Sequence, residues 1–187
     1  MLLLTLGVLL FAGVHFIPSL APGLKNAWTG RLGENGYKGV FSLLLLASFG
    51  LMIGGWRSAE PSFLYAPPPL LHTPALVLMM LAFLLFVVSN RASRLRSIIR
   101  HPQLTGVATW GAAHLMVNGD SRSLVLFGGL AAWALVEIAA INRREGSWVK
   151  GEAPSLAYEG ATVAVAAVVI GVIVLVHPWL AGVPVRW

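Results

Sequence analysis

The chain has 187 residues, of which 57% are hydrophobic and only 11% are charged, and its mean hydropathy is +0.80. Soluble domains carry about 25% charged residues. This composition excludes a soluble protein and indicates one integral membrane domain over residues 1–187. Cysteine is absent, which excludes disulfides, thiol nucleophiles and thiolate metal ligands.

Six apolar stretches follow one another along the chain. They span residues 2–20, 40–56, 74–89, 102–117, 124–141 and 161–180. A helix that crosses a bilayer needs about 17–25 apolar residues. The pattern therefore predicts an all-α, polytopic membrane helix bundle of about six transmembrane helices. The third and fourth stretches are slightly short, and the basic LRSIIR segment between them is expected to lie along the membrane surface.

Lysine and arginine are distributed unevenly between the loops. The loops after the first, third and fifth stretches hold ten of them, and the remaining three are Arg57, Arg122 and Arg186. Positively charged loops stay in the cytoplasm. We therefore expect these three loops inside and both termini on the outer, periplasmic side of a bacterial inner membrane. This distribution accounts for the net charge of +6, so nucleic acid is not expected as a partner.

Short local signals refine the helix ends and the packing. Asn118-Gly119-Asp120 predicts a tight outer turn, with Asp120 or Ser121 capping the fifth helix. Small residues recur at four-residue spacing, as at Gly50 and Gly54, and such pairs let helices approach closely in lipid. The longest loops, 21–39, 57–73 and 142–160, have room for short surface helices but not for a separate core.

Three ionisable residues lie within the apolar stretches, where such residues are candidates for function. They are His15, His114 and Glu137. Glu137 has a structural interpretation, protonated or paired with Arg143 or Arg144, and a functional one, as a proton relay or a contact to a buried polar ligand. His72, His101 and His177 lie at helix ends, where solvation or capping is the ordinary role, and His101 stands out by its basic neighbours.

His15 and His114 allow two interpretations. A neutral imidazole in hydrocarbon must still satisfy a donor and an acceptor. An interhelical hydrogen bond would do this, and so would ligation of a metal or heme. The predicted topology sets the two histidines at heights that differ by about 10 Å. This offset permits them to bind opposite faces of one heme iron and disfavours a compact zinc site.

Small residues precede His114 on its helix. Gly111 lies three residues before it and Gly106 eight residues before it, both near the same helix face, although Val107 interrupts the strip. A strip without side chains would leave room for a flat porphyrin, and the alternative is close helix packing. Trp110 lies within the same stretch and is expected to pack inside the bundle.

Two groups of residues carry a family resemblance. The first is His15 followed by PSLAPGLKNAWTGRLGENGYKG, closing with Phe41 and Ser42. The second is His101-Pro102, Gly106, Trp110 and His114, followed by Asn118-Gly119-Asp120. With them the chain resembles the NnrU family over essentially its whole length.

The resemblance implies an association with nitric oxide and nitrite metabolism in denitrifying bacteria. The family is related to the plastid and cyanobacterial 15-cis-zeta-carotene isomerase, a membrane enzyme with b-type heme held by histidines. The resemblance implies that His15 and His114 correspond to its two axial ligands. Gly111 stands where the isomerase has a cysteine implicated in a ligand switch, so that part of the isomerase mechanism is in doubt here.

Three functional hypotheses remain open at this point. The first is a membrane heme protein of nitrogen-oxide metabolism whose iron binds nitric oxide, and whether it is an enzyme is left open. The second is a heme-dependent cis/trans isomerase of an apolar polyene. The third, a transporter, ranks last because the sequence shows no broken helices in matched halves. An assembly factor or a structural subunit is also compatible with the sequence.

Overall fold

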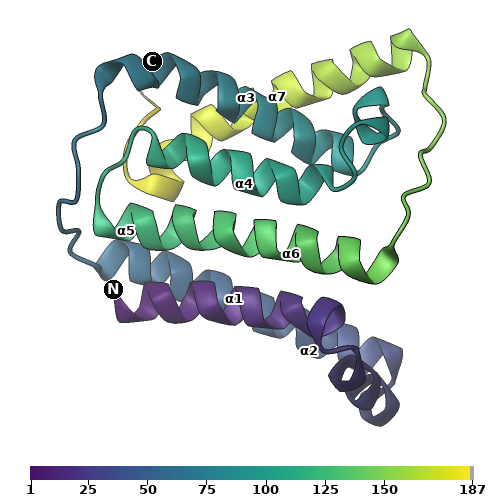
Figure 1. Cartoon of the computed structure of the whole chain (residues 1–187). Coiled ribbons are helices and arrows are strands. Elements are labelled where there is room, and N and C mark those ends of the chain that lie inside the picture. The colour runs from purple at the N-terminus through teal and green to yellow at the C-terminus, as the bar shows by residue number, and fades with distance from the viewer. Residues whose placement is uncertain (186–187) are drawn as a thin grey trace.

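The structure is a computed structural model that describes residues 1–185, so the prediction for Arg186 lies outside the described residues (Figure 1). The described chain consists of helices joined by loops, with one isolated bridge between Phe63 and Asp120. Its α-helices are α1 (Leu2–Leu20), α2 (Pro22–Ser58), α3 (His72–Ser89), α4 (Pro102–Leu115), α5 (Ser121–Ser123), α6 (Gly129–Glu145) and α7 (Leu156–Ala181). The shorter turns are η1 (Pro69–Leu71), η2 (Arg94–Ser97) and the π-helical η3 (Leu124–Gly128). The predicted all-helical membrane fold is confirmed.

Within residues 1–185, five helical segments are long and apolar enough to cross a bilayer. They are α1, α2, η1 with α3, α5 through α6, and α7. The fourth predicted span falls short, because α4 has 14 residues. Such a helix is about 21 Å long, against a hydrocarbon core of about 30 Å. The structure therefore supports five spans by length where the sequence predicts about six.

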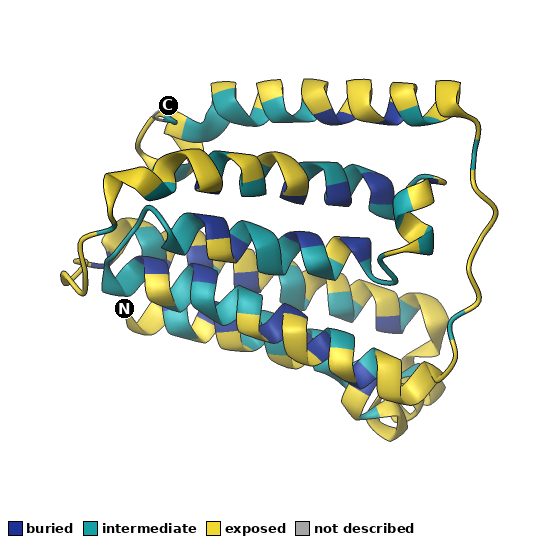
Figure 2. Ribbon diagram, turned by 45° about the horizontal axis from the view of Figure 1, so that its top comes forward, coloured by how far each residue is buried: buried dark blue, intermediate teal, exposed yellow. Residues whose placement is uncertain are grey.

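The helices form two antiparallel pairs joined through α6. The pairs are α1 with α2 and α3 with α4, and α6 packs against both α1 and α4 (Figure 1). α7 packs along α3 and is otherwise exposed (Figure 2). The loops after α1, α3 and α6 lie at one end of the bundle, and both ends of the described chain lie at the other. The three basic loops thus share one end, as the distribution of charge predicts.

Capping and glycine residues explain where several helices begin and end. Asp120 accepts a hydrogen bond from the Ser123 backbone, which confirms it as the cap of the fifth predicted helix. Ser155 caps α7 in the same way. Gly146 and Gly182 follow α6 and α7 with positive φ angles, a conformation that glycine adopts without strain.

The tightest seam of the bundle lies between α1 and α2. A Cβ atom on Gly55 would overlap the Leu4 backbone, and one on Gly7 would lie 2.7 Å from the Met52 amide nitrogen. Gly50 and Gly54, the pair predicted to bring helices together, have open space where a Cβ would stand. That prediction is wrong, because Gly50 and Gly54 do not face α1. The glycine of α2 that contacts α1 is the neighbouring Gly55.

Candidate functional site

His15 lies on α1, near the end of the bundle where the basic loops gather. Its Nδ1 is 2.9 Å from the Phe11 carbonyl oxygen. A carbonyl only accepts hydrogen bonds, so this contact places the ring proton on Nδ1 and leaves a lone pair on Nε2. The ring is held by Phe11, Trp133 and Phe41, with ring centroids 4.2, 4.9 and 5.6 Å away.

His114 lies on α4, near the opposite end of the bundle, and repeats this arrangement. Its Nδ1 is 3.0 Å from the Trp110 carbonyl oxygen, which again leaves the Nε2 lone pair free. The ring stacks on Phe127 at 4.1 Å and contacts Trp110 at 4.8 Å. The Asn118 amide donates to the His114 carbonyl, and the Tyr65 hydroxyl donates to the Asn118 carbonyl. The predicted outer turn therefore anchors the end of the helix that carries His114.

The two histidines flank α6 without a ring contact between them among the described residues. His15 packs on Trp133 and His114 packs on Phe127. Trp133 lies on α6, and Phe127 lies on η3, which leads directly into α6. The two residues are six positions apart, which is about 9 Å along a helix. The spacing agrees with the height difference of about 10 Å expected from the predicted topology.

The hydrogen bonds of the two imidazoles leave Nε2 of each ring available as a ligand for iron. Histidines that bind metals almost always donate their other ring N–H to a carbonyl, a carboxylate or water, which fixes the tautomer. Both His15 and His114 do so toward their own helices. Their Nε2 atoms make no hydrogen bond within residues 1–185. No group of three or more histidine, cysteine, aspartate or glutamate residues in the described chain is arranged to hold a metal ion.

The glycines before His114 serve helix packing. A Cβ on Gly111 would lie 2.5 Å from the Phe127 carbonyl oxygen and 2.9 Å from the Ala131 methyl. One on Gly106 would lie 2.7 Å from the Phe86 ring. The strip proposed to leave room for a porphyrin is instead filled by α6 and α3. The fit of a heme therefore rests on the nitrogen atoms of the histidines.

Glu137 is buried between α6 and α1 with 7% of its surface exposed. Its Oε2 accepts a hydrogen bond from the Ser19 hydroxyl at 2.9 Å. The predicted alternative of a pairing with Arg143 or Arg144 is wrong, because Glu137 forms no ion pair within residues 1–185 and Arg144 instead donates to the Pro18 carbonyl and pairs with Glu145. The sequence offered no signal for Ser19, since serine on an apolar helix is common and its partner depends on which helices are neighbours.

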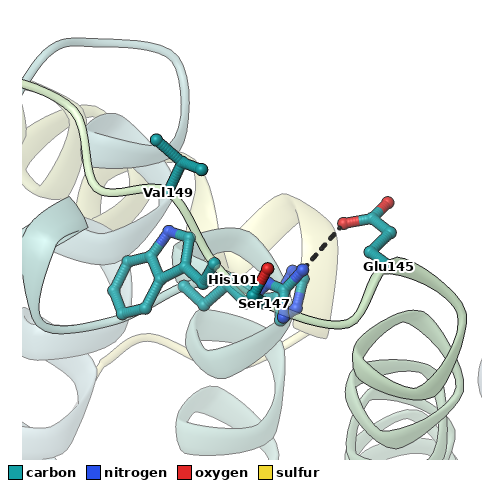
Figure 3. A pocket seen from close by; sticks show the side chains of 6 residues that line it. His101, Glu145, Ser147 and Val149 are labelled. Carbon is teal, nitrogen blue, oxygen red and sulfur yellow. Dashed lines mark hydrogen bonds and ion pairs between the residues drawn. The ribbon is translucent and has the colours of Figure 1, made fainter.

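His101 precedes α4 and lines an open cavity of about 410 Å³ at the basic end of the bundle (Figure 3). Its Nε2 donates to the Asn142 side-chain oxygen at 2.9 Å. Arg100 donates to the Gly146 carbonyl and pairs with Glu145 at 3.2 Å. The sequence did not predict this ion pair, which ties the start of α4 to the end of α6. His101 therefore acts here as a link between helices.

Comparison with known protein families gives one match. The family model described as NnrU protein matches residues 3–185. Comparisons with curated proteins and with solved structures find no match. Because the family match extends over nearly the whole chain, this protein belongs to the NnrU family.

Proposed function

We propose that this protein is a multi-pass protein of the bacterial inner membrane that binds b-type heme through His15 and His114. We further propose that it acts in the nitric oxide and nitrite metabolism associated with its family. The observation that carries the proposal is the shared pose of the two histidines, each with Nδ1 bound to its own helix and Nε2 left free.

A role in helix packing alone would not explain why Nε2 of both histidines lacks a hydrogen-bond partner. An unpaired polar atom in an apolar environment costs about 1–3 kcal/mol by protein mutational data. An imidazole that served packing would be expected to use Nε2 for an interhelical hydrogen bond. An iron atom is a partner that uses this nitrogen, and histidine is the usual axial ligand of b-type heme.

The aromatic side chains around each histidine would position it for this task. Phe127 and Trp110 restrict rotation of the His114 ring, and Phe11 and Trp133 restrict that of His15. Heme, when bound, supplies an iron that takes up a diatomic gas such as nitric oxide.

An absorption spectrum of the purified protein, oxidised and then reduced, tests the proposal. We expect a six-coordinate b-type spectrum in the wild type and its loss in His15→Ala and in His114→Ala. His72→Ala is the matched control, because His72 is exposed at the start of α3 and should leave the spectrum unchanged. A wild type that stays colourless after hemin is supplied rejects the heme.

Exposure of the reduced protein to nitric oxide separates the two heme hypotheses. A nitrosyl spectrum supports a role in handling nitric oxide. Isomerisation of a cis-polyene in lipid vesicles, together with failure to bind the gas, would reject that role in favour of a heme-dependent isomerase. Gly111 bears on this choice, because its position against Phe127 leaves no room for the ligand-switch cysteine of the isomerase.

A further inference from the structure

A line of polar groups runs between α1 and α6 at the basic end of the bundle. Its centre is the hydrogen bond from Ser19 to Glu137, and these two residues are only 8% and 7% exposed. Burial of a carboxyl group inside a membrane bundle is costly, so such groups usually mark ion or proton pathways. A single serine hydroxyl satisfies one of the two carboxyl oxygens.

Trp133 supplies a second, independent indication that a buried water or other small polar molecule binds here. It lies one turn before Glu137 on the same face of α6, and its side chain is 7% exposed. Its indole N–H has no hydrogen-bond partner within residues 1–185. Buried donors in proteins nearly always have a partner, either protein or ordered water. A water-sized acceptor beside this N–H would lie next to His15, whose ring contacts Trp133.

The line reaches the surface at the basic end. Arg144 lies two turns beyond Glu137 on α6, about 10 Å further along the helix axis. Its guanidinium donates to the Pro18 carbonyl at 2.7 Å, directly beside Ser19, and its side chain is 41% exposed. The polar groups thus follow one another from an exposed arginine through Ser19 and Glu137 to Trp133.

We propose that Glu137 is a proton-relay residue that passes protons between the basic surface and a water bound beside Trp133 and His15. In one concerted step, the Ser19 hydroxyl gives its proton to Oε2 of ionised Glu137 and takes another from a hydronium ion at the surface near Arg144, which becomes water. The protonated carboxyl group then rotates about its Cγ–Cδ bond and releases the same proton to the water at Trp133, which becomes hydronium and passes the proton on. One proton moves per cycle, and both side chains return to their starting states.

The polar and titratable groups around Glu137 come from its own helix, from α1 and from the segment before α4. Arg144 lies on the same helix, and α1 contributes Ser19 and His15. His101, just before α4, donates to Asn142 of α6, which lies closer to the basic end than Glu137. Glu145 is already paired with Arg100 and Arg144. The role of the relay as a supply of protons to heme rests on the proposed function, whereas the relay itself does not require heme.

Infrared spectroscopy tests the relay without heme. The band of the protonated Glu137 carboxyl is identified by its loss in Glu137→Gln. We expect this band to shift rapidly when the protein is transferred into heavy water. Ser19→Ala should slow the shift by about 10²-fold, the scale of a lost proton-transfer group. Ser48→Ala is the matched control, since Ser48 is equally buried but bonds only its own helix at Leu45.

Three outcomes would overturn the relay. One is a carboxyl band that resists exchange for hours. Another is exchange that Ser19→Ala leaves unchanged. The third is the absence of any protonated Glu137 over the pH range in which the protein is folded, because a relay must accept a proton.

A second measurement links the relay to heme. In heme-loaded protein, Glu137→Gln should keep the wild-type spectrum and flatten the pH dependence of the heme reduction potential. Glu145→Gln, at the exposed end of α6, should leave that dependence unchanged. Loss of the heme spectrum in Glu137→Gln would reject the relay in favour of a structural role. If the wild type binds no heme, the proposed function fails, and the exchange experiment still decides the relay.

Discussion

At the scale of single residues, the polar side chains inside the bundle divide their hydrogen bonds between their own helix and a neighbour. His15 and His114 each donate a hydrogen bond from Nδ1 to a backbone carbonyl of their own helix. Trp133 packs against the His15 ring, and Phe127 packs against the His114 ring. Glu137 depends on Ser19 of another helix. Local sequence therefore explains the histidine tautomers, whereas the partner of Glu137 follows from the packing of α1 on α6.

Gly111→Ala should destabilise the protein. The added Cβ would lie 2.5 Å from the Phe127 carbonyl, which is backbone and cannot move aside, so α4 and α6 must separate. Overpacking of this kind costs about 1–3 kcal/mol. The measurement is the thermal unfolding midpoint in detergent. Gly50→Ala is the control, because its Cβ meets open space and should stabilise α2 by about 0.5–1 kcal/mol. Equal midpoints for the two variants would contradict this contact.

At the scale of elements, α2 is two helices joined at Gly33. This residue has φ 72° and ψ 168°, a conformation that non-glycine residues rarely adopt. The sequence predicts a loop over residues 21–39 with room for short surface helices, and the structure makes residues 22–39 helical on both sides of the break. Gly33 thereby separates a short helix directly after α1 from the longer helix that continues into the apolar stretch.

Gly33→Ala should strain this break and cost about 1–3 kcal/mol. Gly30→Ala is the matched control, because Gly30 also has open space around its Cβ position but lacks a positive φ. We expect a lower unfolding midpoint and faster tryptic cleavage at the neighbouring Arg31 and Lys38 in Gly33→Ala alone. Wild-type unfolding midpoints and cleavage rates in both variants would contradict the strain expected at Gly33.

The short α4 ends within its predicted apolar stretch of residues 102–117. Pro102 begins it, and the turn around Gly119 ends it, where the Gly119 carbonyl accepts from the Leu64 and Tyr65 amides. A Cβ on Gly119 would overlap the Tyr65 carbonyl, so the loop before α3 lies directly across this turn. The Asn118-Gly119-Asp120 turn predicts this stop from the sequence, and the loop before α3 reinforces it from elsewhere in the chain.

At the scale of the whole molecule, α6 joins the two helix pairs, because it packs against both α1 and α4. α7 instead lies at the edge, held to α3 at its basic end by Arg91 donating to Thr162 and by Ser93 donating to Glu159. Its remaining apolar surface is available for lipid (Figure 2). Function is therefore expected to depend on α1, α4 and α6 far more than on α7.

The orientation of the bundle is tested by labelling, and the lack of native cysteine makes the experiment direct. Glu60 and Gly151 are exposed in loops at opposite ends of the bundle. An impermeant maleimide should label Glu60→Cys in intact cells and label Gly151→Cys only after permeabilisation, because basic loops stay inside. The reverse pattern would invert the topology and place the Glu137 relay on the outer side.

The sequence by itself determined that this protein is a helical membrane bundle of the NnrU family. Backbone groups in lipid must be satisfied within each segment, so apolar runs become helices, and ionisable residues within them stand out. The central position of α6, the packing role of Gly111 and the pairing of Glu137 with Ser19 became clear only in the folded bundle. These features depend on which helices become neighbours. Hydropathy contains no such information, because every apolar helix is equally suited to lipid and its neighbours are chosen by side-chain packing across the bundle.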